Sequence, residues 1–382
     1  MKCDILIKGG HVIDPIRSVS KIGDVVIAGN KLLTSDDVKQ YQPDLVIDAS
    51  GCIVTPGLID FHTHVFYRGT ENSIAPDISL LPSGITTAVD GGSAGSANFE
   101  AFYHSVIRTS MVRIIAYLNI ASAGQTTMRY DENLDPTCFD SDKIAALFQQ
   151  YNSSLAGIKI RFTSGIVNDF GMEALEKTLQ IATDNHCPIM VHPNDPPCTT
   201  EELVGHLRPG DIFTHVYHAM GDHILDDKGM IKKAVIEARN RGVIFDAANG
   251  RSNFAFKTAL PAMRQGFNPD IISSDLTPLN LYRQPAFGLP FLMSKYLAMG
   301  MSLEQVVTAC TSIPAKCLNM ADEIGTLAPG ACADVAIFRM EKMKVRFLDI
   351  CGQESWGSRL LVPKMTIKSG NIVYKDFLFG ID

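Results

Sequence analysis

The chain has 382 residues, of which 46% are hydrophobic and 20% are charged, a composition typical of a globular protein. Its formal charge is −7 and it has no basic run, which argues against a nucleic-acid-binding protein. No apolar run is long enough to cross a membrane, and the nine scattered cysteines, none in a CxxC pair, are expected to be reduced thiols of a cytoplasmic protein.

Short apolar runs ended by turn residues predict β-strands near both ends of the chain. They lie at 4–10, 24–30 and 45–51 on the N-terminal side, and at 333–340 and 363–376 on the C-terminal side. Because a different pattern fills the middle, we expect one small β-domain assembled from both termini, made of residues 1–54 and 323–382.

The middle of the chain alternates short apolar runs with segments of helical spacing. Eight such runs lie at 58–65, 84–92, 113–122, 157–163, 188–195, 211–218, 243–250 and 271–275. Helices are predicted between and after them, at 172–185, 230–242, 254–266 and 291–300. Eight strand–helix repeats predict a (β/α)₈ TIM-type barrel over residues 55–322. A doubly wound open sheet is the alternative, but no GxGxxG follows the first run.

A glycine-rich sequence, GGSAGS at 91–96, follows the second apolar run. Two interpretations are open: a tight turn beneath an active site, or a loop whose backbone cradles a phosphate. We favour the tight turn.

Polar side chains fall at the ends of these runs, where the active sites of (β/α)₈ barrels lie. Side chains at i and i+2 of a strand point the same way, so His62 and His64 can both face the barrel axis and share one ion. Lys159 lies within an apolar run, where an unpaired ammonium is costly. A metal site beside it would resolve this, because such an amine can be carboxylated by CO₂. Later runs end in further candidates: His192, His215, His218, Asn249, Arg251 and Asp275.

This pattern resembles the amidohydrolase superfamily of metal-dependent hydrolases over nearly the whole chain. IDASGCIVTPGLIDFHTH (47–64) looks like that family's approach to its first barrel strand, and GTLAPGACADVAIF (325–338) like its return to the small β-domain. The segments 207–218, 242–259 and 267–277 are similar to one branch, whose members are labelled dihydroorotase, adenine deaminase or deacetylase. Some members of that branch are similar to esterases of the acetyl-mandelate type.

The resemblance implies a binuclear metal centre. It implies two divalent ions, with zinc expected, bridged by a CO₂-derived carboxylate on Lys159. The more buried ion would be held by His62, His64 and Asp275, and the more exposed ion by His192 and His215. Asp275 is the expected catalytic residue, which takes a proton from the nucleophile and passes it to the leaving group.

The expected reaction is hydrolysis of an amide or ester acyl bond by a metal-bridging hydroxide, on a small substrate that bears a carboxylate. Candidate substrate-binding residues are Arg251, Asn249, Arg161 and His218, since a guanidinium can hold a carboxylate bidentately. Relatives are commonly oligomers, so a homo-oligomer is expected.

Three alternatives stay open: a cyclic amidohydrolase of the dihydroorotase or hydantoinase kind, an adenine-type deaminase, and a non-catalytic assembly homologue. Dihydroorotases carry an arginine two residues after the HxH pair, where this chain has Phe66 and places Arg68 two residues further on. Deaminases of the superfamily lack the lysine ligand, so Lys159 argues against that activity. The complete ligand set argues against a non-catalytic protein.

Overall fold

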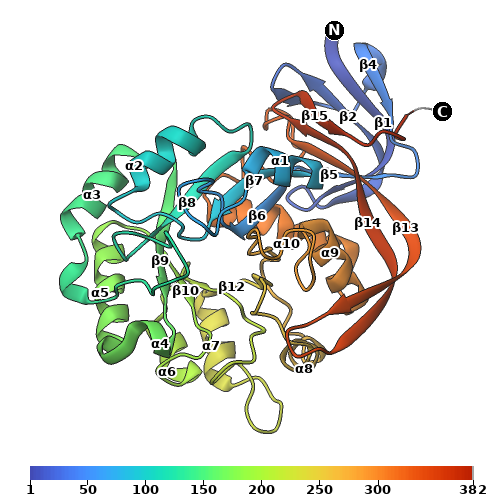
Figure 1. Cartoon of the computed structure of the whole chain (residues 1–382). Helices are drawn as coiled ribbons and strands as arrows, with labels where there is room; N and C mark the ends of the chain where they lie inside the picture. The colour runs from blue at the N-terminus through green and yellow to red at the C-terminus, as the bar shows by residue number, and fades with distance from the viewer. Residues whose placement is uncertain (381–382) are drawn as a thin grey trace.

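A computed structural model describes residues 1–380 and contains two β-sheets, one curled within a layer of helices and one beside it (Figure 1). The seven strands of the curled sheet are parallel neighbours in chain order. They are β6 (Leu58–Thr63), β7 (Ile85–Asp90), β8 (Arg113–Asn119), β9 (Leu155–Arg161), β10 (Ile189–His192), β11 (Ile212–Phe213) and β12 (Ile244–Phe245). The predicted TIM-like barrel is confirmed.

The eighth predicted strand, 271–275, closes the ring without forming a regular strand. Isolated parallel bridges join Ile271 to Asp246 beyond β12, and Leu276 to Thr63 at the end of β6. Regular pairing fails because Asp275 has a positive φ of 50° and the Ser274 amide donates to the side chain of Asp60 instead of to a neighbouring strand. The segment still spans the gap between the first and seventh strands.

Helices cover the outside of the barrel (Figure 1). They are α1 (Pro76–Leu80), α2 (Phe99–Phe102), α3 (Ser141–Gln150), α4 (Ser164–Val167), α5 (Gly171–Asp184), α6 (Thr200–His206), α7 (Lys233–Arg241), α8 (Phe256–Arg264), α9 (Leu289–Ala298), α10 (Leu303–Cys310) and α11 (Ser312–Cys317). The four predicted helices correspond to α5, α7, α8 and α9. Helix α7 begins three residues later than predicted, because Asp226 accepts from the amides of Lys228 and Met230 and so holds these residues in a turn.

The second sheet is built from both ends of the chain, as predicted. Its strand order is β15-β14-β13-β5-β1-β2-β3, and β4 pairs with β1. Its strands are β1 (Lys2–Asp14), β2 (Val19–Ala28), β3 (Lys31–Leu33), β4 (Gln42–Asp48), β5 (Ile53–Pro56), β13 (Val335–Leu348), β14 (Glu354–Lys368) and β15 (Asn371–Lys375). The N-terminal and C-terminal parts meet where β5 pairs antiparallel with β13.

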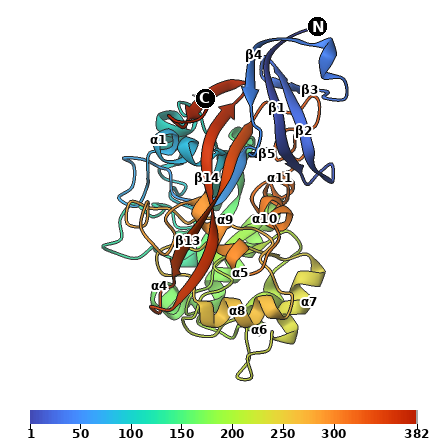
Figure 2. The same cartoon turned by 90° about the vertical axis from the view of Figure 1, so that its right-hand side faces the viewer.

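The hairpin of β13 and β14 extends beyond this sheet and runs along the barrel (Figure 2). Its contact with helix α9 includes a hydrogen bond of 2.9 Å from the Leu361 amide to Ser294 Oγ. This extension could not be predicted from the sequence, because apolar runs show that a strand exists but not which surface its far end covers. Within residues 1–380, no helix combines the length and apolar character needed to cross a membrane.

Candidate metal centre

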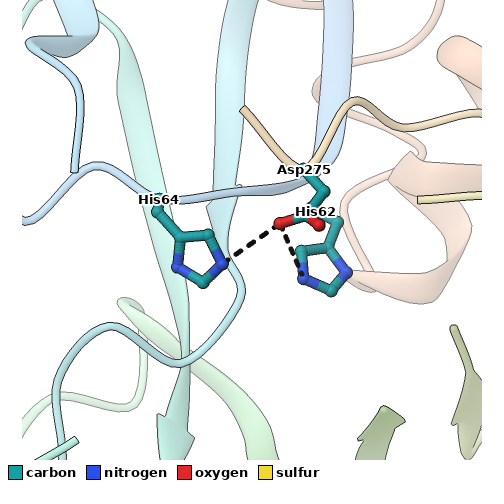
Figure 3. A group of neighbouring side chains, drawn as sticks. All are labelled: His62, His64 and Asp275. Carbon is teal, nitrogen blue, oxygen red and sulfur yellow. Dashed lines mark ion pairs between the residues drawn. The ribbon is translucent and has the colours of Figure 1, made fainter. Parts of the chain in front are cut away.

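The barrel brings His62, His64 and Asp275 together at one end of its strands. Their ligand atoms all lie within 4.8 Å of one another, and Figure 3 shows both rings beside the Asp275 carboxylate. The Asp275 Oδ1 atom lies 3.2 Å from His64 Nε2 and 3.8 Å from His62 Nε2. Two imidazole nitrogens and a carboxylate oxygen form a donor set that suits zinc and similar divalent ions.

A second pair of imidazoles lies next to this group. His192 ends β10, and its Nδ1 atom lies 2.8 Å from Nε2 of His215, which follows β11. The His215 ring centre is 5.2 Å from that of His62. The two nitrogen atoms share a hydrogen bond at this distance, so these imidazoles are further candidate ligands beside the first group.

Lys159 lies on β9, which pairs with β10, and it lines the same cavity as His62 and His192. It is 1% exposed, and its Nζ atom is 3.3 Å from His62 Nε2. Burial lowers the pKa of the Lys159 amine to about 8, although the nearby carboxylates of Asp275 and Asp246 act in the opposite direction. The neutral amine is therefore more populated near neutral pH than in an exposed lysine.

Outer contacts aim the three histidine Nε2 atoms inward. Nδ1 of His64 is 2.9 Å from Ser93 Oγ, and Nδ1 of His62 is 3.5 Å from Asp246 Oδ2. His215 Nδ1 donates to the carbonyl oxygen of Ala248 at 2.7 Å. Because a carbonyl only accepts, His215 must carry its proton on Nδ1 and keep a lone pair on Nε2, as metal-binding histidines do.

The electrostatics favour neutral imidazoles and an ionised carboxylate. Burial lowers the pKa values of His62 and His215 well below the ordinary range, and Lys159 adds to this effect. Burial alone would raise the pKa of Asp275, but the hydrogen bond with His64 and the neighbouring His62 and His215 lower it overall. These are the protonation states that bind metal ions.

The glycine-rich segment after β7 is a tight turn against the metal centre. A Cβ atom on Gly91 would lie 2.5 Å from His62 Cδ2 and Nε2, and one on Gly92 would lie 2.5 Å from Lys159 Cγ. The amides of Gly92 and Ser93 already donate to the Asp90 carboxylate, at 3.1 and 2.7 Å. These amides are thus not free to cradle a phosphate, which supports the tight-turn interpretation.

Gly91→Ala is expected to weaken metal binding about tenfold or more, because the new methyl group displaces the His62 ring. Competition with a chelator measures the change in affinity. Gly165→Ala is the matched control, since a Cβ atom there meets nothing within 4 Å. Unchanged affinity in Gly91→Ala would show that the turn does not limit the position of His62.

A cavity of about 200 Å³ opens onto the predicted ligands, and two candidate substrate-binding residues line it. Arg161 is committed to an ion pair of 2.7 Å with Glu132, a buried residue of the loop after β8. Arg251 is exposed at the cavity and forms no ion pair within residues 1–380. Arg251 is therefore the better placed of the two to bind an anionic group of a substrate.

The other two candidates do not line the cavity. Asn249 is fully buried, accepts a hydrogen bond of 2.6 Å from Lys295 Nζ and donates one of 3.3 Å to the Tyr296 hydroxyl. His218 lies in a turn, with its amide bonded to the His215 carbonyl, because β11 already ends at Phe213. The regular strand predicted to reach His218 is thus too long, and strand alternation does not set the direction of that side chain.

Two charged or amide side chains that contact predicted ligands were not predicted. Asp246 faces His62, and Asn253 donates a hydrogen bond of 2.8 Å to Asp275 Oδ2. An aspartate inside the apolar run at 243–250 is the same kind of signal that singled out Lys159 and could have identified Asp246. Asn253 lies beyond the end of β12 and gives no such signal.

Residues 53–373 match the amidohydrolase family. The chain belongs to the amidohydrolase family. This amidohydrolase is 32% identical to a deacetylase of Brucella anthropi over 91% of its own length and 85% of that protein. It is also similar to the crystal structure of an adenine deaminase (TM-score 0.90, 26% identity, 98% and 100% coverage) and to that of a dihydroorotase (TM-score 0.86, 29% identity, 97% and 98% coverage). It is a hydrolase of this family with a His–His–Asp metal-binding group.

Proposed function

We propose that this amidohydrolase uses two divalent metal ions, zinc in the first place, to remove an acyl group from a small carboxylate-bearing substrate. The observation that carries the proposal is the arrangement of His62, His64 and His215. Nδ1 of His64 and of His215 is hydrogen-bonded on the outer side, and Nδ1 of His62 faces Asp246 Oδ2 at 3.5 Å. Nε2 of each ring faces another predicted ligand, Asp275 for His62 and His64 and His192 for His215. Side chains that merely filled a barrel core would not need this common orientation.

The residues present fit the ions. His62, His64 and Asp275 would hold one ion. His192 and His215 would hold the other ion, and carboxylated Lys159 would bind both. When bound, such ions supply Lewis acidity toward a carbonyl oxygen and lower the pKa of water toward neutrality.

Carboxylation of Lys159 needs only CO₂. The neutral amine forms an N–C bond to CO₂ and releases one proton, which leaves a carbamate with two oxygen atoms. Burial of Lys159 beside His62 favours the neutral amine that reacts, and the product replaces an uncompensated buried ammonium with an anion that ions on both sides would neutralise.

Asp275 would take a proton from the nucleophile and pass it to the leaving group. Its low pKa keeps the Asp275 carboxylate ionised at neutral pH. Asn253 holds Oδ2 at 2.8 Å, so Oδ1 is the atom that faces His62, His64 and the cavity. An amide leaving group would require the return of that proton, whereas an ester would depend on it less.

Several features favour an acyclic acyl substrate with a carboxylate. Arg251 places at the cavity a guanidinium that forms no ion pair within the described residues 1–380. The Brucella anthropi relative is named a deacetylase. Phe66, at the position where dihydroorotases carry arginine, packs against Phe102 with a ring separation of 4.7 Å, and Arg68 lies outside the metal cavity. The likeness to a dihydroorotase and an adenine deaminase structure keeps those two activities as the second candidates.

The experiment is a substrate panel on the purified protein with its metal content measured. It contains N-acyl amino acids, acylated hydroxy acids, hydantoins, dihydropyrimidines and adenine, and pairs each acyclic acid with its neutral carboxamide. We expect about two ions per chain, hydrolysis of the acyclic acids, and weaker hydrolysis of the carboxamides. Arg251→Met should remove the preference for the acid.

Asp275→Asn, purified in the same way, controls for a contaminating hydrolase. A preference for cyclic substrates or adenine would overturn the acyl-hydrolase assignment. Two bound ions with no hydrolysis of any compound would favour a non-catalytic protein.

A further inference from the structure

One segment, Asp246–Asn253 after β12, contacts ligands of both expected metal ions. Asp246 Oδ2 lies 3.5 Å from His62 Nδ1. The Ala248 carbonyl accepts the 2.7 Å hydrogen bond from His215 Nδ1. These two contacts reach one ligand of each ion, although the segment itself contains no predicted ligand.

The last residue of the segment, Asn253, makes a third contact, to Asp275. Asn253 Nδ2 donates to Asp275 Oδ2 at 2.8 Å, and its Oδ1 accepts from Asn194 Nδ2 at 2.6 Å. Gly250 has a positive φ of 55°, and a Cβ atom there would overlap both Asp275 Oδ2 and Asn253 Nδ2. The backbone thus approaches Asp275 more closely than a side chain would permit.

Hydrogen bonds to helix α9 and to residues 273–274 hold the segment in place. The buried Lys295 of α9 donates to Asn249 Oδ1 at 2.6 Å, and Asn249 donates in turn to the Tyr296 hydroxyl. On the barrel side, the amides of Asn249 and Gly250 donate to the carbonyls of Ser273 and Ser274. A turn fixed on both sides can hold its contacts to the ligands in one geometry.

We propose that Asp246–Asn253 positions the ligands of both metal ions, with Asp246 and Asn253 as its positioning side chains. The inference rests on the proposed function, because it requires that the ions bind. Asp246 Oδ2 faces His62 Nδ1 at 3.5 Å, and neither atom has a hydrogen-bond partner within residues 1–380, so Asp246 is the acceptor that would keep the His62 proton on Nδ1 and leave Nε2 for the ion. Asn253 fixes the carboxylate plane of Asp275, so that Oδ1 faces the ions.

Asp246→Asn tests the first contact without changing the size of the side chain. Oδ1 of Asp246 accepts from the Ala248 amide at 3.2 Å and from Ser273 Oγ at 2.6 Å, so the single oxygen of asparagine stays there. Its NH₂ group then faces His62 Nδ1, which must accept, and the His62 proton moves to Nε2 and blocks the ligand atom. We expect metal affinity to fall 10- to 100-fold.

The matched control is Asp14→Asn. Asp14 is equally buried, but it lies in the other sheet and accepts from Thr326 Oγ1 and the Leu327 amide. Asp14→Asn should lower the melting temperature of the metal-free chain and leave metal affinity unchanged. Asp246→Asn should change affinity and reduce the gain in melting temperature that metal produces.

Asn253→Ala, at the edge of the cavity, is the second variant and should also bind metal about tenfold more weakly. Zinc affinity of the metal-free chain is measured by chelator competition for every variant. Wild-type affinity in both Asp246→Asn and Asn253→Ala would overturn the positioning role alone. Failure of the wild-type chain to bind zinc would overturn the metal centre itself and, with it, this inference.

Discussion

Lys159→Ala is expected to bind at most one ion per chain where the wild-type protein binds two, and to lose hydrolase activity about 10³-fold. Lys159 is the side chain expected to supply oxygen atoms to both ions, because its Nζ atom lies 3.3 Å from His62 Nε2 and it lines the same cavity as His192. Losing one ion removes charge stabilisation worth several kcal/mol, and every 1.36 kcal/mol is a factor of ten in rate. Elemental analysis and kcat measure the two losses.

Lys368→Met provides the matched control for removal of a buried lysine. Lys368, the last residue of β14, is 7% exposed and forms an ion pair of 2.7 Å with Asp334. Arg113 also forms an ion pair with Asp334, so this carboxylate keeps a cationic partner when Lys368 is removed. This variant should retain two ions and wild-type kcat. Two ions per chain and near-normal kcat in Lys159→Ala would show that the lysine bridges nothing.

The sequence was sufficient to predict the barrel because its strands are buried on both faces and appear as apolar runs in chain order. It also assigned the six predicted metal ligands to those runs. His62, His64 and Asp275 could be assigned to one group because parallel strands present their carboxyl ends at the same side of a barrel.

What could not be predicted is how the chain turns after each strand ends. Asn249 was expected at the substrate, yet Ala248 before it has a positive φ of 33° and Asn249 contacts Lys295 and Tyr296 instead. The period of two applies only within a strand, and β12 ends at Phe245. Contacts such as Asp246 to His62 join residues far apart in the chain, so no local spacing reveals them.

Asp275→Asn is expected to lower kcat by about 10²- to 10⁴-fold, the range expected when a proton-transferring group is lost. An amide cannot accept the proton. Its single oxygen would also face the NH₂ group of Asn253, 2.8 Å from the present Oδ2. The amide nitrogen would then take the place of Oδ1, 3.2 Å from His64 Nε2, and could not bind an ion.

Metal content separates these two effects of Asp275→Asn. Saturating zinc should restore the ion held by His62 and His64 without restoring kcat, because the proton acceptor stays absent. Asp14→Asn again controls for loss of a buried carboxylate. If saturating zinc restored more than a tenth of the wild-type kcat, Asp275 would be a ligand only, and proton transfer would have to be assigned to another group at the cavity.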